Sequence, residues 1–168
     1  MLEFYQAYAD YQDLMQLSAE LLKNVAIDAN GSPVVNFQGV ELDFGQVRRY
    51  TIREAVCEFY KGKEKPSLDD VRDPVWLGRH SDKATAGEAL VDIFERHCEE
   101  ALIQPTIIYE YPVEVSPLAK QNAGEPSMTD RFEIFAAGME LGNAFTELND
   151  PNEQRKRFEM QLAMKERG

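Results

Sequence analysis

The segment DRFEIFAAGMELGNAFTELND, residues 130–150, constrains the fold more than any other part of the chain. It holds three glutamates, Glu133, Glu140 and Glu147, among apolar residues that favour a buried or half-buried position. An ionised carboxylate is costly to bury unless a cation or a hydrogen-bonding partner compensates its charge. Three carboxylates in one short apolar segment therefore indicate a cation-binding site.

The same segment predicts a β-hairpin that turns at Ala137-Gly138, between two apolar runs. Counting outward from this turn places Phe135 opposite Glu140. Glu133 shares a face with Phe135 and is diagonal to Glu140, about 7–8 Å away at the backbone, so the two glutamates can hold one divalent ion. The alternative is an amphipathic helix that carries both glutamates on a solvated stripe, which the glycines in the segment disfavour.

Beyond Glu140 the alternation changes, so Asn143, Phe145 and Glu147 form a second set of side chains on one face. A β-bulge at Gly142 would bring both sets to the same side of the sheet. We therefore expect one face of the hairpin to hold a metal and phosphate region beside a small polar pocket.

The composition is that of an ordinary globular chain, and its 168 residues are typical of one domain. The formal net charge of −12 argues against a general attraction to nucleic acid or to anionic membranes. We expect no transmembrane helix and no signal peptide, because the required apolar runs are missing from the sequence. Cys57 and Cys98 are expected to be structural thiols, and neither His80 nor His97 has the spacing of a zinc ligand.

The remaining segments alternate between helical and extended patterns. Four of them begin with an N-cap residue that precedes apolar residues at helical spacing, and we expect helices there: residues 11–27, 51–61, 85–101 and 151–166. Alternating or β-branched segments predict strands: residues 2–7, 34–37, 40–44 and 106–109. Residues 61–84 are polar and contain two prolines, so we expect a loop-rich insertion.

Three segments resemble one protein family in collinear order. They are AYADYQDLM (residues 7–15), LIQPTIIYEYPVEVSPLAK (102–120) and DRFEIFAAGMELGNAFTELNDPNEQRKRFE (130–159). Together they resemble the catalytic domain of bacterial class II lysyl-tRNA synthetases. The resemblance implies an α+β fold, in which an antiparallel sheet flanked by helices carries ATP and the amino acid on one face.

The resemblance also implies roles for individual residues. Glu3 and Tyr5 match residues that contact the lysine substrate, and Glu133 and Glu140 match carboxylates that hold Mg²⁺ between the ATP phosphates. The rest of the implied lysine pocket is Asn143, Phe145 and Glu147, with Glu147 facing the ε-ammonium group. The residue types fit these implied roles, because hard cations prefer carboxylate oxygens and a lysine side chain needs a negative charge at the end of an apolar slot.

By the same resemblance, an intact family member activates lysine with ATP to lysyl-adenylate and transfers it to tRNA(Lys). It would act in the cytoplasm as a homodimer, with no membrane contact. Residues 1–168 would span part of the catalytic domain, from the second strand of the family's motif 2 to a point before motif 3. The arginines that grip ATP in the family would lie before Met1 and after Gly168. We therefore assign no catalytic residue and expect the isolated chain to be inactive.

Two other functions fit the sequence. One is the related enzyme that lysylates an elongation factor, which shares the pattern GxELxNxFxEL found at residues 138–148. The segments at residues 7–15 and 116–120 resemble the tRNA enzyme more closely. The other is a non-catalytic acidic module that binds lysine or a partner, in which Glu3 and Tyr5 would be an ordinary pair on an edge strand.

Overall fold

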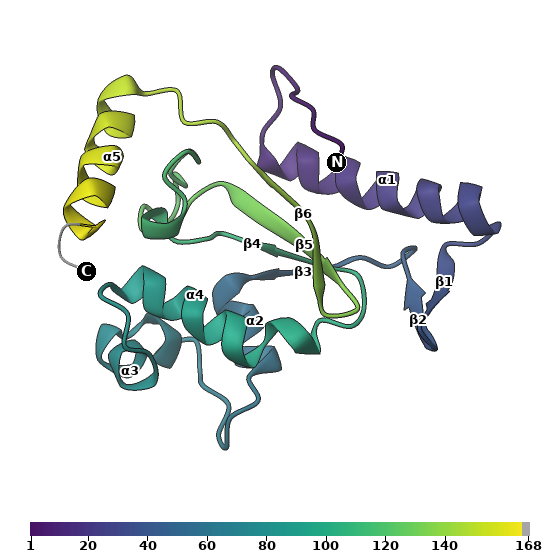
Figure 1. Cartoon of the computed structure of the whole chain (residues 1–168), viewed down its shortest axis with the longest axis horizontal. Helices are drawn as coiled ribbons and strands as arrows, with labels where there is room; N and C mark the ends of the chain where they lie inside the picture. Colours follow the sequence, from purple (N-terminus) through teal and green to yellow (C-terminus); the bar gives the residue numbers. More distant parts are fainter. Residues whose placement is uncertain (166–168) are drawn as a thin grey trace.

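The computed structural model describes residues 1–165, in which helices pack on both faces of a four-stranded sheet (Figure 1). The sheet has the order β3-β4-β5-β6 and contains β3 (Arg48–Thr51), β4 (Thr106–Tyr109), β5 (Arg131–Ala136) and β6 (Met139–Phe145). A separate hairpin joins β1 (Val34–Phe37) to β2 (Val40–Asp43). The expected α+β class is confirmed. The sheet is antiparallel except for β3, which runs parallel to β4 because the chain crosses over between them through helices on one face.

Five α-helices surround these strands: α1 (Tyr11–Asn30), α2 (Ile52–Phe59), α3 (Pro74–His80), α4 (Ala86–His97) and α5 (Pro151–Lys165). Three 3₁₀ turns accompany them: η1 (Asp70–Arg72), η2 (Glu99–Ala101) and η3 (Val113–Val115). The predicted N-caps are confirmed at Asp10, Thr51 and Thr85, each of which forms a reciprocal capping box. Asp150 caps α5 by accepting from the backbone N–H of Asn152.

Helix α3 lies inside residues 61–84, so the expectation of a loop-rich insertion missed one regular element. Asp73 caps this helix by accepting from the N–H of Val75, and Pro74 occupies its first turn. An aspartate followed by proline is the same helix-start signal that correctly marked α5. The signal was therefore present, but the polar composition around it obscured a short helix.

The sheet separates two apolar cores. On one face α2 and α4 pack their apolar stripes against Ile108 and Phe135. On the other face α1 packs Tyr11 and Met15 against Ile107, Phe132 and Ile134. Successive residues of a strand point to opposite faces, which is why the neighbours Ile107 and Ile108 belong to different cores. The predicted site residues that belong to β5 and β6 lie on the face that carries α4.

Both hairpins turn through two residues in the left-handed region. Ala137 and Gly138 have φ values of 54° and 71°, and Gln38 and Gly39 have 52° and 84°. Two positive φ values in succession define a type I′ turn, whose twist matches that of the flanking strands. The predicted hairpin at residues 130–150 is confirmed, and its helical alternative is wrong.

The strand expected at residues 2–7 is not formed. Residues 1–6 have no regular structure, and a turn follows in which Tyr8 has a φ of 59° (Figure 1). A strand requires a hydrogen-bonded neighbour, and within residues 1–165 no segment pairs with this one. The alternation of its side chains predicted a strand that the described fold does not complete.

The cysteines and histidines are packing residues. Both thiols are free, and burial raises the pKa of Cys98 to about 12. The His80 ring stacks on Trp76 at a centroid distance of 3.9 Å, and His97 packs against another aromatic ring. Within the described residues no helix is both long enough and apolar enough to cross a bilayer.

Candidate functional site

A β-bulge in the β5–β6 hairpin sets the geometry of the site. Phe135 lies opposite Glu140, but the next residue back, Ile134, lies opposite Gly142. Leu141 is therefore the extra residue on β6, and the alternation of side chains shifts by one at this point. The predicted irregularity near Gly142 is confirmed, with Leu141 as the residue that bulges.

The bulge brings the predicted site residues of the hairpin to one face. After the register shift Glu133 lies opposite Asn143, and Arg131 lies opposite Phe145. Residues opposite each other in a ladder share a face, so these side chains lie on the same side of the sheet as Glu140. If the same sequence paired regularly, without the bulge, Asn143 and Phe145 would point to the face that packs against α1.

Glu133 is held in a fixed orientation by two donors. Its Oε1 accepts a 2.5 Å hydrogen bond from Arg131 Nη2, and its Oε2 accepts a 2.7 Å hydrogen bond from the Tyr111 hydroxyl. The Glu133 side chain is 13% exposed and that of Arg131 is 17% exposed, so this ion pair is largely screened from water. Arg131 compensates the charge of the Glu133 carboxylate, and the two hydrogen bonds restrict its side chain to one rotamer.

Arg131 connects the two halves of the predicted site. Its Nε donates to Asn143 Oδ1 at 3.2 Å, while Nη1 donates to the Val115 carbonyl and to Ser116 Oγ. The guanidinium also lies over the ring of Tyr111, at 4.8 Å from its centroid. A glutamate predicted to hold a metal ion and an asparagine predicted to line a lysine pocket therefore share one positioning residue.

The sequence reasoning missed Arg131 and Tyr111. Arg131 lies two residues before Glu133 on the same strand, so the i, i+2 spacing of opposite charges was a usable signal. Tyr111 gave no such signal, because it lies in a segment between prolines that is distant from Glu133 in sequence. Only the pairing of β4 with β5 brings the two side chains together.

A cavity of about 260 Å³ lies between this face of the hairpin and α4. Figure 1 shows α4 running along the same side of the sheet. The residues that line the cavity are Val91, Phe94, Glu95, Glu99, Tyr111, Val115, Arg131, Glu133, Phe135 and Glu140. Four of these residues are glutamates, two from the α4–η2 region and two from the hairpin, and one is an arginine. The lining therefore carries more acidic than basic side chains.

The electrostatics of the cavity favour a cation. Burial, and then the charge of Glu133, raises the pKa of Glu140. Burial also raises the pKa of Glu99, to which the charges of Glu95, Glu133 and Glu140 add. A carboxyl whose pKa is raised by neighbouring carboxylates is stabilised in its charged form when a cation binds nearby.

Glu133 and Glu140 are the two carboxylates that the hairpin contributes to this cavity. Within the described residues no group of three or more carboxylate, histidine or cysteine side chains is arranged as a complete metal site. Mg²⁺ commonly takes one or two carboxylates and completes its shell with water and substrate phosphates. Glu133 and Glu140 therefore fit a metal that arrives with a phosphate-bearing ligand.

The other predicted lysine-pocket residues lie at the far end of the hairpin. Glu147 follows β6, is exposed, and forms an isolated backbone bridge with Ala119. Tyr5 donates a 2.8 Å hydrogen bond to Glu3, which raises the pKa of Tyr5, and the charge of Glu147 raises it further. Glu3 and Tyr5 are exposed and lie outside any strand.

Comparisons with known proteins identify the family of the chain. The profile of the family described as tRNA synthetases class II (D, K and N) matches residues 1–167. The lysine–tRNA ligases of Psychromonas ingrahamii and Methanoculleus marisnigri are each 44% identical to the chain over 174 residues, and that of Dichelobacter nodosus is 45% identical. Each alignment covers 100% of the chain but only 34–35% of the relative, so the chain spans about a third of their length. The chain belongs to the class II tRNA synthetase family of the D, K and N type.

Proposed function

We propose that this chain carries part of the lysine and ATP site of a lysine–tRNA ligase. The observation that carries the proposal is the bulge at Leu141, which places Glu133, Glu140, Asn143 and Phe145 on one face. These four side chains are the hairpin residues that the family resemblance assigns to metal and lysine. A shift of one residue in the pairing would separate them onto opposite faces.

Glu133 and Glu140 would hold Mg²⁺ together with the phosphates of ATP. The ion would neutralise the charge that develops on the phosphates when the lysine carboxylate attacks. Arg131 and Tyr111 support this role by fixing the carboxylate of Glu133. Among the described residues, no hydrogen bonds fix the Glu140 carboxylate in this way. We therefore propose that Glu140 is the ligand whose side chain adjusts to the position of the ion.

The lysine substrate would lie beyond the metal, toward the end of β6. Glu147 would pair with the ε-ammonium group, and Phe145 would line the aliphatic part of the side chain. Asn143, whose Oδ1 accepts from Arg131, would present its amide N–H groups to the substrate. Glu3 and Tyr5, which the resemblance assigns to the same pocket, are exposed and hydrogen-bonded to each other.

We also propose that the 168-residue chain does not form lysyl-adenylate alone. Within the described residues Arg131 is the one cationic side chain that lines the acidic cavity, and it already binds Glu133, Asn143 and Ser116. Adenylate formation needs cations directed at the α-phosphate. For a full-length member of the family, the partners would be tRNA(Lys) and a second copy in the cytoplasm. The similarity to lysine–tRNA ligases favours this function over lysylation of an elongation factor.

The test is calorimetric titration of the chain with lysine, with and without Mg²⁺ and ATP. We expect Glu147→Gln to weaken lysine binding about tenfold or more, and Glu140→Gln to weaken Mg·ATP binding with less effect on lysine. Glu41→Gln, an exposed glutamate on the separate β1–β2 hairpin, is the matched control.

Two results would contradict the proposal. One is lysine binding that is equally strong in the Glu147→Gln variant, which would place the pocket elsewhere. The other concerns the inactivity of the chain and is measured separately. Lysine-dependent exchange of pyrophosphate into ATP by the purified chain would show that it is a complete catalyst.

A further inference from the structure

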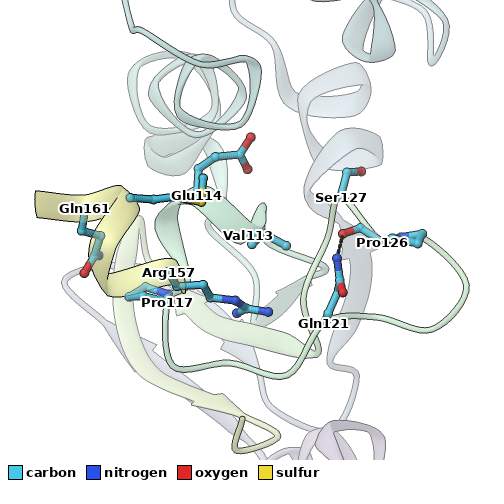
Figure 2. Close-up of a pocket in the computed structure, with 9 residues that line it drawn as sticks. Val113, Glu114, Pro117, Gln121, Pro126, Ser127, Arg157 and Gln161 are labelled. Carbon is cyan, nitrogen blue, oxygen red and sulfur yellow. Dashed lines mark hydrogen bonds between the residues drawn. The ribbon is translucent and has the colours of Figure 1, made fainter. Parts of the chain in front are cut away.

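A second cavity, of about 180 Å³, lies on the side of the molecule formed by α5 and the segments around η3 (Figure 2). It is lined by Val113, Glu114, Pro117, Gln121, Pro126, Ser127, Arg157, Met160 and Gln161. None of these residues lines the acidic cavity between α4 and the β5–β6 hairpin. A single buried water needs only ~10–15 Å³ of such space, so the cavity has room for a small organic molecule.

The cationic group in this cavity is Arg157, whose side chain is only 4% exposed. Its Nε donates to Glu153 Oε1 at 3.2 Å, and its Nη1 donates to the carbonyls of Ser116 and Ala119 at 3.2 and 2.6 Å. These contacts hold α5 against the loop that follows η3. They also fix the plane of the guanidinium, because three of its bonds have defined directions.

The remaining nitrogen of this guanidinium, Nη2, has no acceptor. Nη2 is buried, and among the described residues no group accepts a hydrogen bond from it. Figure 2 shows the guanidinium extending from α5 into the space between Pro117 and Gln121. A buried N–H without a partner costs about 1–3 kcal/mol, and more when the group is charged. The guanidinium therefore holds one buried, unsatisfied donor at the wall of a preformed cavity.

The rest of the lining defines the class of ligand. Val113, Pro117, Pro126 and Met160 give the cavity apolar walls. The carboxylate of Glu114 is directed away from Arg157 in Figure 2, toward Gly87 at the start of α4. A multiply charged anion such as phosphate would face largely apolar walls, the Glu114 carboxylate and one cationic donor. A monoanion with an aliphatic body satisfies both parts of the lining.

We propose that this cavity is a binding site for small aliphatic monocarboxylates. The carboxylate accepts from Arg157 Nη2, and the hydrocarbon part packs against Val113, Pro126 and Met160. The site is separate from the proposed lysine and ATP site and does not depend on it. It lies where α5 contacts the loop after η3, so an occupied site strengthens the attachment of α5 to the rest of the fold.

The test is a titration of the ¹⁵N-labelled chain with butyrate, followed by two-dimensional NMR. We expect saturable shifts at the Gln121 side-chain amide, at Ser127 and at the Arg157 guanidinium. Butyramide has the same shape without the charge, and we expect it to bind about tenfold more weakly or worse. Inorganic phosphate is expected to cause no saturable change at these positions.

Two variants separate binding from folding. Arg157→Gln removes the cationic guanidinium, and Met160→Trp fills the cavity from a side chain that is 53% exposed while it leaves Arg157 intact. We expect both to weaken butyrate binding about tenfold or more. Arg155→Gln, on the exposed surface of the same helix, is expected to bind butyrate like the parent chain.

The proposal is overturned if butyrate causes no saturable shifts, since Nη2 would then be satisfied by water alone. It is also overturned if butyramide or phosphate binds as well as butyrate. Because Met160→Trp keeps the ion pair of α5, unchanged binding in that variant would refute the site even if Arg157→Gln fails to fold.

Discussion

The Tyr111 hydroxyl donates a 2.7 Å hydrogen bond to Glu133 Oε2, which ties the segment after β4 to the centre of β5. Burial, and then the charge of Glu133, raises the pKa of Tyr111 well above its usual range, so the hydroxyl remains a donor at neutral pH. The orientation of a proposed metal ligand thus depends on a residue outside the hairpin, in the segment after β4. This dependence can be measured by the stability of the fold.

Tyr111→Phe is expected to lower the free energy of unfolding by about 1.5–3 kcal/mol, because Glu133 loses one of its two buried donors. Urea denaturation of the chain measures the change. Tyr109→Phe is the control, since this ring packs in the core on the opposite face of the sheet. An equal loss in both variants would mean that the hydroxyl of Tyr111 contributes nothing specific.

The Arg131–Glu133 ion pair is expected to be strongly coupled. Replacing either residue with methionine leaves the other charge largely buried and should cost about 3–5 kcal/mol. The double variant should cost clearly less than the sum of the two single variants, because neither charge is then left alone. Denaturation of all four proteins gives the coupling energy.

The surface pair Lys61–Glu100 is the comparison for this cycle. Its side chains are 49% and 88% exposed, so water screens their attraction and the coupling should be close to zero. A coupling between Arg131 and Glu133 as small as that of the surface pair would contradict a structural role for the buried pair.

The raised pKa of Glu140 predicts a pH dependence of stability. The folded state holds this proton more tightly than the unfolded chain, so the contribution is full below the unfolded pKa of about 4.3. It is lost as pH rises through the higher folded pKa. We therefore expect Glu140→Gln to gain stability relative to the parent chain as pH rises over this range.

Denaturation midpoints of the parent chain and of Glu140→Gln, measured at several pH values from about 4 to 7, test this sign. Glu41→Gln, on the separate β1–β2 hairpin, shows how much of the change is common to any lost carboxylate. A difference between Glu140→Gln and the parent that shrinks as pH rises would show that the sign is wrong.

Gly87 lies in the first turn of α4, against the Glu114 carboxylate. A Cβ at this position would lie 2.3 Å from Glu114 Oε2 and 2.8 Å from Pro112 Cβ, both too close for contact. We expect Gly87→Ala to destabilise the chain by about 1–3 kcal/mol, since the neighbouring segment must move. Thermal unfolding measures the loss.

Gly78→Ala on α3 is the matched control for this substitution. A Cβ there meets no atom within 4 Å, so the added helix propensity should stabilise the chain by up to about 1 kcal/mol. The two substitutions are chemically identical and are expected to have opposite signs. A stabilising effect of Gly87→Ala would show that Glu114 yields easily.

The sequence predicted the local features of this fold correctly, because their causes lie within a few residues. The turn at Ala137-Gly138, the cap at Asp10 and the bulge near Gly142 each follow from short-range hydrogen bonding and side-chain alternation. The placement of Glu133 and Glu140 on one face is likewise a matter of counting along two strands joined by a short turn.

Only the tertiary structure decided which groups surround those glutamates. Tyr111 and Glu99 reach the cavity through strand pairing and helix packing across long stretches of sequence, and no local pattern encodes such contacts. The segment around Tyr5 shows the converse: its alternation predicted a strand, but a strand forms only when a neighbour supplies the hydrogen bonds. The sequence by itself therefore determined how the hairpin folds and which way its side chains point. The assembled structure decided which charges meet there, because electrostatic compensation depends on distances between segments that packing alone brings together.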